Sequence, residues 1–99
     1  MAELIWTEQA LEDLDATCLY IARDAPTASK MFAYKAFEAS DLLQEFPLMG
    51  RIVPELDQAN IRELLLGHYR LIYSFDPKRD QVAVLTLLHG ARMFPIDDF

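Results

Sequence analysis

The chain of 99 residues has a single cysteine, Cys18, so it cannot form a disulfide within itself. No cluster of cysteines and histidines has the spacing of a zinc site, and we expect neither a metal nor another cofactor. No apolar run approaches the ~20 residues of a membrane-spanning helix. No basic stretch followed by an apolar run marks a signal peptide. The sequence therefore predicts a cytoplasmic protein without a membrane contact.

Basic side chains are also scarce. The formal net charge is −7, and residues 1–48 carry three basic against nine acidic side chains, which is a net charge of −6. Residues 49–92 carry six basic against five acidic side chains, which is a net charge of +1. Because nucleic acid phosphates repel an acidic protein, only a local arginine cluster in the second half can bind phosphate. We expect no direct DNA binding by this chain alone.

The apolar residues that are present suffice for one folded core. Hydrophobic residues make up 53% and charged residues 25% of the chain, which is typical of a globular protein. A chain of this length forms one domain, which we expect to span residues 1–99. No internal repeat or low-complexity tract divides it.

The N-terminal half has the pattern of a strand followed by two helices. Residues Glu3–Trp6 suit a short strand, and Thr7 suits the N-cap of a helix that runs to about Arg23. Pro26 marks the start of a second helix, which we expect to end at Pro47. The short link between them predicts an antiparallel helical hairpin.

The second predicted helix is apolar on more than one side. Its main stripe faces the core, but Met31, Tyr34 and Leu42 lie off that stripe. An amphipathic helix normally exposes polar side chains at such positions, so these three residues indicate a surface that another chain covers.

The second half predicts strands. The β-like runs are residues 51–53, 61–66, 69–75 and 82–88. The tight turn at Gly67 and His68 makes a hairpin of the second and third runs. We expect the last run, apolar on both faces, to lie inside the sheet. The predicted fold class is therefore α+β, with an N-terminal strand and a helical hairpin packed on an antiparallel sheet.

Strand alternation separates the candidate site residues. Leu71 and Tyr73 should face the helices, and Arg70 should then point to an open face. Either Arg62 or Glu63 must lie nearer the core and needs a partner there, but alternation does not decide which. The candidate site on the open face consists of Arg51, Glu55, Arg70, His89 and Arg92.

These residue types allow two interpretations. Arginine binds phosphate or carboxylate with two hydrogen bonds, while glutamate and histidine serve as general base and acid in phosphodiester cleavage. The competing interpretation is structural, because arginine and glutamate on neighbouring strands commonly form ion pairs that stabilise a sheet. The sequence leaves both open.

Several short motifs follow one another in an order that resembles the RelE/ParE superfamily of small bacterial toxins, and its ParE branch most closely. They are Trp6 before an acidic helix, Tyr20-Ile21-Ala22, Asp24 with Pro26, Pro47, Gly50-Arg51, Pro54-Glu55, Arg62-Glu63-Leu64, Tyr69-Arg70-Leu71-Ile72-Tyr73 and Leu88-His89-Gly90-Ala91-Arg92. The series covers about residues 4 to 92.

The resemblance implies the toxin of a type II toxin–antitoxin system that inhibits DNA gyrase and is neutralised by a cognate antitoxin. It implies that the gyrase-contacting residues are Arg51, Arg62, Arg70, His89 and Arg92. The antitoxin-contacting residues would be Met31, Tyr34 and Leu42. The sequence leaves open whether two copies of the chain form a homodimer.

The same superfamily also contains ribosome-dependent mRNA endoribonucleases of the RelE type. Glu55, Arg70 and His89 resemble the acid, arginine and histidine of some of these nucleases. The acidic net charge and the absence of lysine from residues 51–66 favour gyrase inhibition over RNA cleavage. A third alternative is a toxin fold that only binds its antitoxin.

Overall fold

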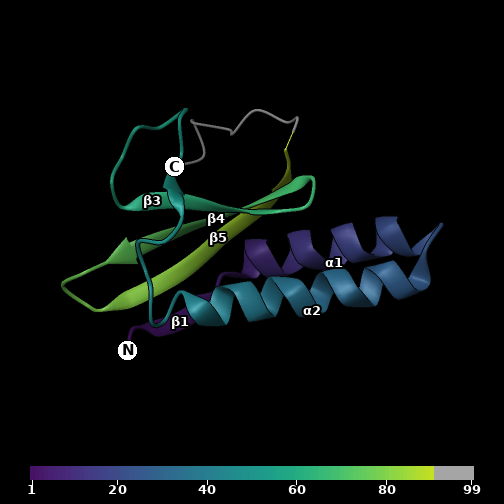
Figure 1. Cartoon of the computed structure of the whole chain (residues 1–99), viewed down its shortest axis with the longest axis horizontal. Helices are drawn as coiled ribbons and strands as arrows, with labels where there is room; N and C mark the ends of the chain where they lie inside the picture. Colours follow the sequence, from purple (N-terminus) through teal and green to yellow (C-terminus); the bar gives the residue numbers. More distant parts are fainter. Residues whose placement is uncertain (91–99) are drawn as a thin grey trace.

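The computed structural model describes residues 1–90 and contains five strands and two helices in these residues. In chain order they are β1 (Glu3–Trp6), α1 (Glu8–Ala22), α2 (Pro26–Leu42), β2 (Arg51–Ile52), β3 (Ile61–Leu66), β4 (Tyr69–Asp76) and β5 (Gln81–His89). The helices pack on one face of the sheet, and the segment between β2 and β3 lies over the other face (Figure 1). This arrangement confirms the predicted α+β class. Neither described helix is long and apolar enough to cross a membrane.

The predicted antiparallel sheet is present as β2 to β5, and the N-terminal strand extends it in the parallel direction, so the complete sheet is mixed. Its strand order is β1-β5-β4-β3-β2, and β1 runs parallel to β5 while the other neighbours are antiparallel. The direction of β1 is set at both of its ends. The backbone N–H of Glu3 donates to Asp80, and the Thr7 hydroxyl donates to the carbonyls of Val84 and Leu85. The interior position predicted for the last strand is confirmed.

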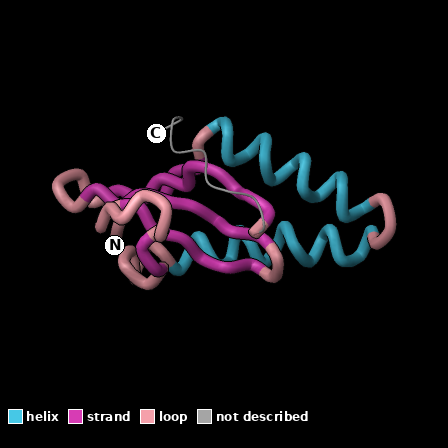
Figure 2. The backbone as a smooth tube through the Cα atoms, turned by 90° about the horizontal axis from the view of Figure 1, so that it is seen from above, coloured by secondary structure: helices cyan, strands magenta, loops and turns pink. Residues whose placement is uncertain are grey.

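The helical hairpin forms where the capping residues predict it. The Thr7 hydroxyl accepts a hydrogen bond from the N–H of Ala10 at 3.1 Å and caps α1. Pro26 occupies the first turn of α2, where its missing N–H is not needed. The second helix ends at Leu42 rather than at Pro47. Figure 2 shows the two helices running on past the end of the strands.

Small side chains bring the two helices close together. The Ser29 hydroxyl on α2 donates to the carbonyl of Cys18 on α1 at 2.6 Å, and Ala36 is completely buried. The main core lies between the hairpin and the sheet. Its fully buried members include Ala10, Ala36, Leu43, Leu71, Tyr73, Val82 and Val84. Burial of this apolar surface is the chief stabilising term for the fold.

A second, smaller core lies on the opposite face of the sheet. It consists of Val53, Ile61, Ile72 and Leu88, with Leu56 and Leu85 packed against it. Val53 and Leu56 belong to the segment of residues 53–60, which follows β2 and covers this face (Figure 1). The sheet therefore has an apolar layer on both sides.

Candidate functional site

Four charged side chains meet on the face of the sheet opposite the helices. Glu63 on β3 pairs with Arg51 on β2 and with Ile72 on β4. Arg70 stands two residues before Ile72 on the same face, which makes it a diagonal neighbour of Glu63. The turn at Gly67 and His68 fixes this register, because it pairs the residues on either side of it.

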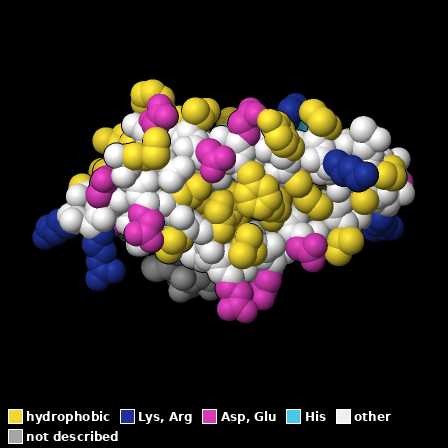
Figure 3. Space-filling model, turned by 90° about the horizontal axis from the view of Figure 1, so that it is seen from below, with side chains coloured by type: hydrophobic (Ala, Val, Ile, Leu, Met, Phe, Trp, Pro, Cys, Tyr) yellow, Lys and Arg dark blue, Asp and Glu magenta, His cyan; other side chains and the backbone are white. Residues whose placement is uncertain are grey.

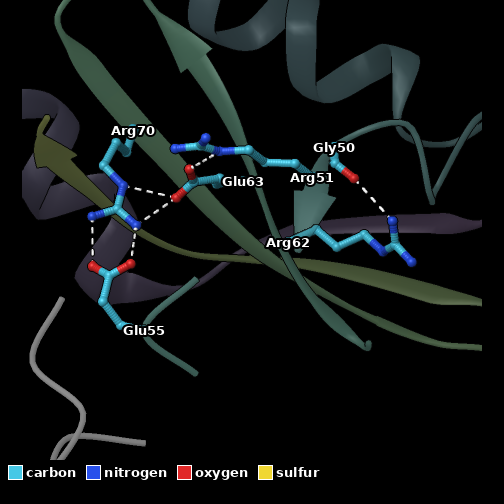
Figure 4. A network of polar contacts seen from close by, with 6 residues as sticks. All are labelled: Gly50, Arg51, Glu55, Arg62, Glu63 and Arg70. Atoms are coloured by element: carbon cyan, nitrogen blue, oxygen red, sulfur yellow. Dashed lines mark hydrogen bonds and ion pairs between the residues drawn. The ribbon is translucent and has the colours of Figure 1, made fainter. Parts of the chain in front are cut away.

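The four side chains form one chain of alternating charge (Figure 4). The two terminal nitrogens of Arg70 donate to the two carboxylate oxygens of Glu55, each at 2.8 Å. The Nε of Arg70 donates to Glu63 Oε1 at 2.7 Å, and the Nε of Arg51 donates to Glu63 Oε2. The paired bonds between Arg70 and Glu55 have the planar geometry that a guanidinium also uses for phosphate.

Burial divides these four residues into an internal group and an external one. The side chains of Glu63, Arg70 and Glu55 are 0%, 8% and 15% exposed, whereas that of Arg51 is 61% exposed. Hydrogen bonds from Arg70 to Glu55 and Glu63 raise the pKa of the Arg70 guanidinium despite its burial, so it stays charged. Two positive and two negative charges cancel, and only Arg51 presents a cation to solvent.

A second network holds the segment before β2 against the sheet. The hydroxyl of Tyr73 accepts from the N–H of Gly50 at 3.0 Å and donates to the carbonyl of Pro47 at 2.7 Å. The terminal Nη1 of Arg62 donates to the carbonyl of Gly50 at 3.0 Å (Figure 4). A Cβ at Gly50 would lie 2.6 Å from the carbonyl oxygen of Glu63, so only glycine fits there.

The predicted open face is therefore only partly open. The prediction that Arg70 points away from the helices is confirmed, but the prediction that this face is open at Arg70 is wrong. The segment of residues 53–60 buries its apolar side chains there and brings Glu55 onto the guanidinium. The structure also decides between Arg62 and Glu63, because Glu63 is the buried member of that pair, 1% exposed.

The predicted site residues do not all meet. The structure brings Arg51, Glu55 and Arg70 together, whereas Arg62 points to the opposite face and donates to backbone carbonyls there. His89 lies on the other face, because it pairs with Tyr69 across the ladder and its ring is 5.3 Å from that of Tyr69. Arg92 lies outside the described residues.

The sequence reasoning missed Glu63 as the centre of this site. The signal was present in the hairpin register, since a two-residue turn at Gly67 and His68 places Glu63 and Arg70 diagonally on one face. The buried Glu63 carboxylate lies between Arg51 and Arg70, and together with Glu55 it balances their two charges. Among the described residues, no group of three or more potential ligands is arranged to hold a metal ion.

A helical hairpin packed on a five-stranded mixed sheet that includes the N-terminal strand matches the RelE/ParE class of small toxins. Within this class, residues 4–94 match the family model described as the ParE toxin of the type II toxin–antitoxin system parDE. The chain belongs to this family, as the ordered motifs of the sequence predict.

A curated relative agrees with this assignment. The chain is 38% identical over 93 residues to a Caulobacter vibrioides protein named Toxin RelE2, and the alignment covers 94% of this chain and 100% of that relative. The relative carries a RelE name while the family model carries a ParE name.

Solved structures share the fold. The chromosomal ParDE system of P. aeruginosa superposes with a TM-score of 0.73 at 21% identity, covering 90% of this chain and 96% of that chain. The RelBE2 toxin–antitoxin complex of Mycobacterium tuberculosis gives 0.57 at 24% identity, covering 89% and 96%. The isolated E. coli RelE toxin gives 0.61 at 17% identity, covering 99% and 94%. At these identities the similarity shows the fold alone.

Proposed function

We propose that this toxin inhibits DNA gyrase by binding it as a protein, without performing chemistry on a nucleic acid. The family assignment supports the toxin role, and the match to the ParE model supports gyrase as the target. The surface supports a protein contact, because a chain with a net charge of −7 is repelled by the phosphates of DNA and RNA.

The observation that carries this proposal is the separation of the nuclease candidates. A general base and a general acid must both reach the reacting phosphodiester. Glu55 is held by both terminal nitrogens of Arg70 on one face, and His89 pairs with Tyr69 on the other face. The sheet lies between them, so the described geometry favours an inhibitor over a nuclease.

Arg51 is the residue of this network that is placed to contact gyrase. Its Nε is held by buried Glu63, and the rest of its guanidinium reaches solvent. A guanidinium fixed at one nitrogen loses little freedom when it pairs with a carboxylate of a partner, so it favours binding. Arg62 points to the opposite face of the sheet, where it already donates to the carbonyls of Leu48, Gly50 and Ala59.

The test is a DNA supercoiling assay with purified gyrase. The protein should block supercoiling, and Arg51→Ala should require about tenfold more protein for half-inhibition, a difference of ~1.4 kcal/mol in binding. Arg79→Ala is the matched control, because Arg79 is also well exposed, at 77%, but lies in the turn between β4 and β5. No inhibition at micromolar excess, or equal loss in both variants, would contradict the proposal.

Ribosome-dependent cleavage of mRNA is the second candidate, and the RelE name of the curated relative favours it. Primer extension after induction should then show cuts within codons, and His89→Ala should abolish them. Uncut messages would remove this candidate. Cuts that persist in the Glu55→Gln and His89→Ala variants would show that the predicted residues are not the catalytic ones.

The antitoxin is the second partner that we propose, and its docking surface runs along α2. Met31, Tyr34 and Leu42 are 51%, 65% and 46% exposed, which is unusual for apolar side chains of this size. Hydrophobic side chains gather across this side of the molecule, with acidic ones among them (Figure 3). An apolar partner segment gains buried area here.

Two hollows extend this surface towards the sheet. Met31 lines one of about 400 Å³ together with Phe32 and Leu66, and Leu42 lines another of about 600 Å³ together with Phe46 and Phe75. β2 pairs only with residues 62–63 of β3, so within the described part of the chain the edge of β3 beyond them has no strand partner, and Leu65 in this stretch is 62% exposed. An open edge and adjacent apolar hollows suit an extended chain.

Co-purification with the product of a neighbouring short reading frame tests this surface. Met31→Asp and Leu42→Asp should weaken the complex at least about tenfold, since each places a charge in an apolar contact. Leu19→Asp is the matched control, because Leu19 is 63% exposed on α1 and lines neither hollow. Equal weakening by all three substitutions would contradict this surface, and size-exclusion chromatography of the free toxin would detect a homodimer.

A further inference from the structure

A third hollow lies on the α1 side, away from the charged network. Its volume is about 560 Å³, and it opens between α1, the turn from β3 to β4, and the end of β5. The residues that give it chemical character are Asp13, Thr17, Tyr20, His68, Tyr69 and His89. A volume of this size is typical of binding sites for a small group or a side chain with its neighbours.

Asp13 places a negative charge in this hollow. Its Oδ2 accepts from the hydroxyl of Thr86 and from the N–H of Leu87, the latter at 3.2 Å, and these bonds fix its orientation. Within residues 1–90 its Oδ1 accepts from Gln9 alone, at 2.8 Å, so these residues leave one of the about four lone-pair positions of the carboxylate unused. The ion pairs formed among residues 1–90 do not include Asp13.

The carboxylate of Asp13 is hydrogen-bonded to β5 near the end of that strand. On one edge of β5, β1 pairs only with residues 81–84, so among the described residues β5 has no strand partner on that edge beyond Val84. Asp13 on α1 accepts the N–H of Leu87 in this stretch, where no strand supplies a carbonyl.

Two tyrosine rings line the same hollow as this carboxylate. Tyr69 is fixed by edge contacts with Phe32 at 5.2 Å and with His89 at 5.3 Å between ring centroids. Tyr20 is 64% exposed, and the guanidinium of Arg23 lies 5.9 Å from its ring centroid. The faces of such rings attract cations, and a flat guanidinium stacks on them better than a compact ammonium group.

We propose that this hollow binds the guanidinium group of an arginine side chain carried by the antitoxin. The bond to Asp13 Oδ1 supplies the charge contact, and Tyr20 and Tyr69 supply the flat surfaces. The wall repels a phosphate, because α1 carries four acidic and no basic side chains. The choice of the antitoxin as the carrier rests on the function proposed above.

The position of the hollow supports the antitoxin as the source. Gly67 lines the hollow of about 400 Å³ beside α2, and the next residue, His68, lines this one. A segment that lies along α2 therefore reaches Asp13 by crossing only the turn between β3 and β4. A single extended chain can occupy both hollows.

The probe for this site is N-acetyl-arginine amide, followed by amide chemical shifts of the purified toxin. Saturable shifts should appear at Thr17 and Leu87, and N-acetyl-citrulline amide, which is flat but uncharged, should bind at least about tenfold more weakly, since it lacks the charge contact. Asp13→Asn should weaken arginine binding by a similar factor. Equal binding of both probes, or shifts elsewhere only, would overturn the proposal.

A second pair of variants keeps the test decisive if Asp13→Asn does not fold. Tyr20→Ala should reduce arginine binding several-fold. Leu19→Ala should leave it unchanged, because Leu19 is similarly exposed, 63% against 64% for Tyr20, but does not line the hollow. Stronger shifts with a short single-stranded RNA than with the arginine probe would overturn the choice of ligand.

The complex gives the final arm of the test. Co-purified antitoxin should prevent the probe from binding, and a complex that still binds the probe would show that the antitoxin does not fill the hollow. The probe titrations and the variant comparisons use the free toxin and require neither gyrase nor antitoxin. Failure of the supercoiling assay and failure of this inference are therefore distinguishable.

Discussion

The two faces of this sheet are closed in different ways. On one face a helical hairpin covers Leu71, Val82 and Val84 mainly with apolar side chains. On the other face a loop of residues 53–60 contributes few apolar side chains, and the cover includes Glu55 on Arg70. A short loop cannot bury enough apolar area to seal a sheet face, so paired charges complete the layer. Pointing away from the helices therefore does not make an arginine accessible to a target when a loop covers that face of the sheet.

Removing the central charge should have the largest effect. Arg70→Met is expected to lower the free energy of unfolding by about 3–5 kcal/mol, because it leaves buried Glu63 and Glu55 without their shared guanidinium. Urea unfolding followed by circular dichroism measures this change. Adding Glu55→Gln and Glu63→Gln should recover part of the loss. An unchanged midpoint for Arg70→Met would show that charge does not hold the loop-covered face together.

The neighbouring residue probes the other face. Leu71→Ala is expected to lower the free energy of unfolding by about 3 kcal/mol, because it opens a cavity in the core under the helices. The same urea experiment measures it, and in this case Gln substitutions at Glu55 and Glu63 should recover nothing. Recovery there would mean that the two faces are coupled.

The hydroxyl of Tyr73 links the core under the helices to the loop before β2. Tyr73→Phe should cost about 1–3 kcal/mol, because the N–H of Gly50 and the carbonyl of Pro47 lose their partner. Thermal unfolding at neutral pH measures this loss. Tyr34→Phe, on exposed Tyr34, should cost nothing.

Alkaline pH gives an independent check on the same hydroxyl. Burial raises the pKa of Tyr73 in the folded state, although the hydrogen bond from Gly50 opposes the shift. The unfolded chain therefore loses this proton first, and its contribution to stability is complete below the usual tyrosine pKa of about 10 and falls above it. The free energy of unfolding should fall less steeply above that pH in Tyr73→Phe than in the wild type. Identical slopes would contradict the burial of this hydroxyl.

The outermost residue of the network should have the smallest effect on stability. Arg51→Ala is expected to cost less than about 1 kcal/mol, because its pair with Glu63 is largely exposed on the arginine side. Per folded molecule, Arg51→Ala should nevertheless reduce gyrase inhibition more than Leu71→Ala does. The reverse order would place the gyrase contact away from this face.

Local patterns in the sequence predicted most of the fold. Alternation placed Leu71 and Tyr73 under the helices and Arg70 opposite them, and Thr7 and Pro26 placed the two helix starts. The burial of Arg70 could not be predicted in this way, because it depends on where residues 53–60 fold back. The parallel pairing of β1 also lay beyond local patterns, since Glu3 and Gln81 are distant in the chain. The position of Glu63 beside Arg70, in contrast, could have been predicted from the register of the β3–β4 hairpin.

The position of β5 between β1 and β4 has a consequence for synthesis on the ribosome. The first strand of the described chain finds its partner only in the last one, so β1 cannot join the sheet until β5 has been made. The hairpin of β3 and β4 can form earlier. At that stage the hydroxyl of Thr7, at the start of α1, still lacks the carbonyls of Val84 and Leu85 as hydrogen-bond acceptors. A nascent chain that is still incomplete therefore has no assembled toxin surface, and a cell meets the folded molecule only after β5 has left the ribosome.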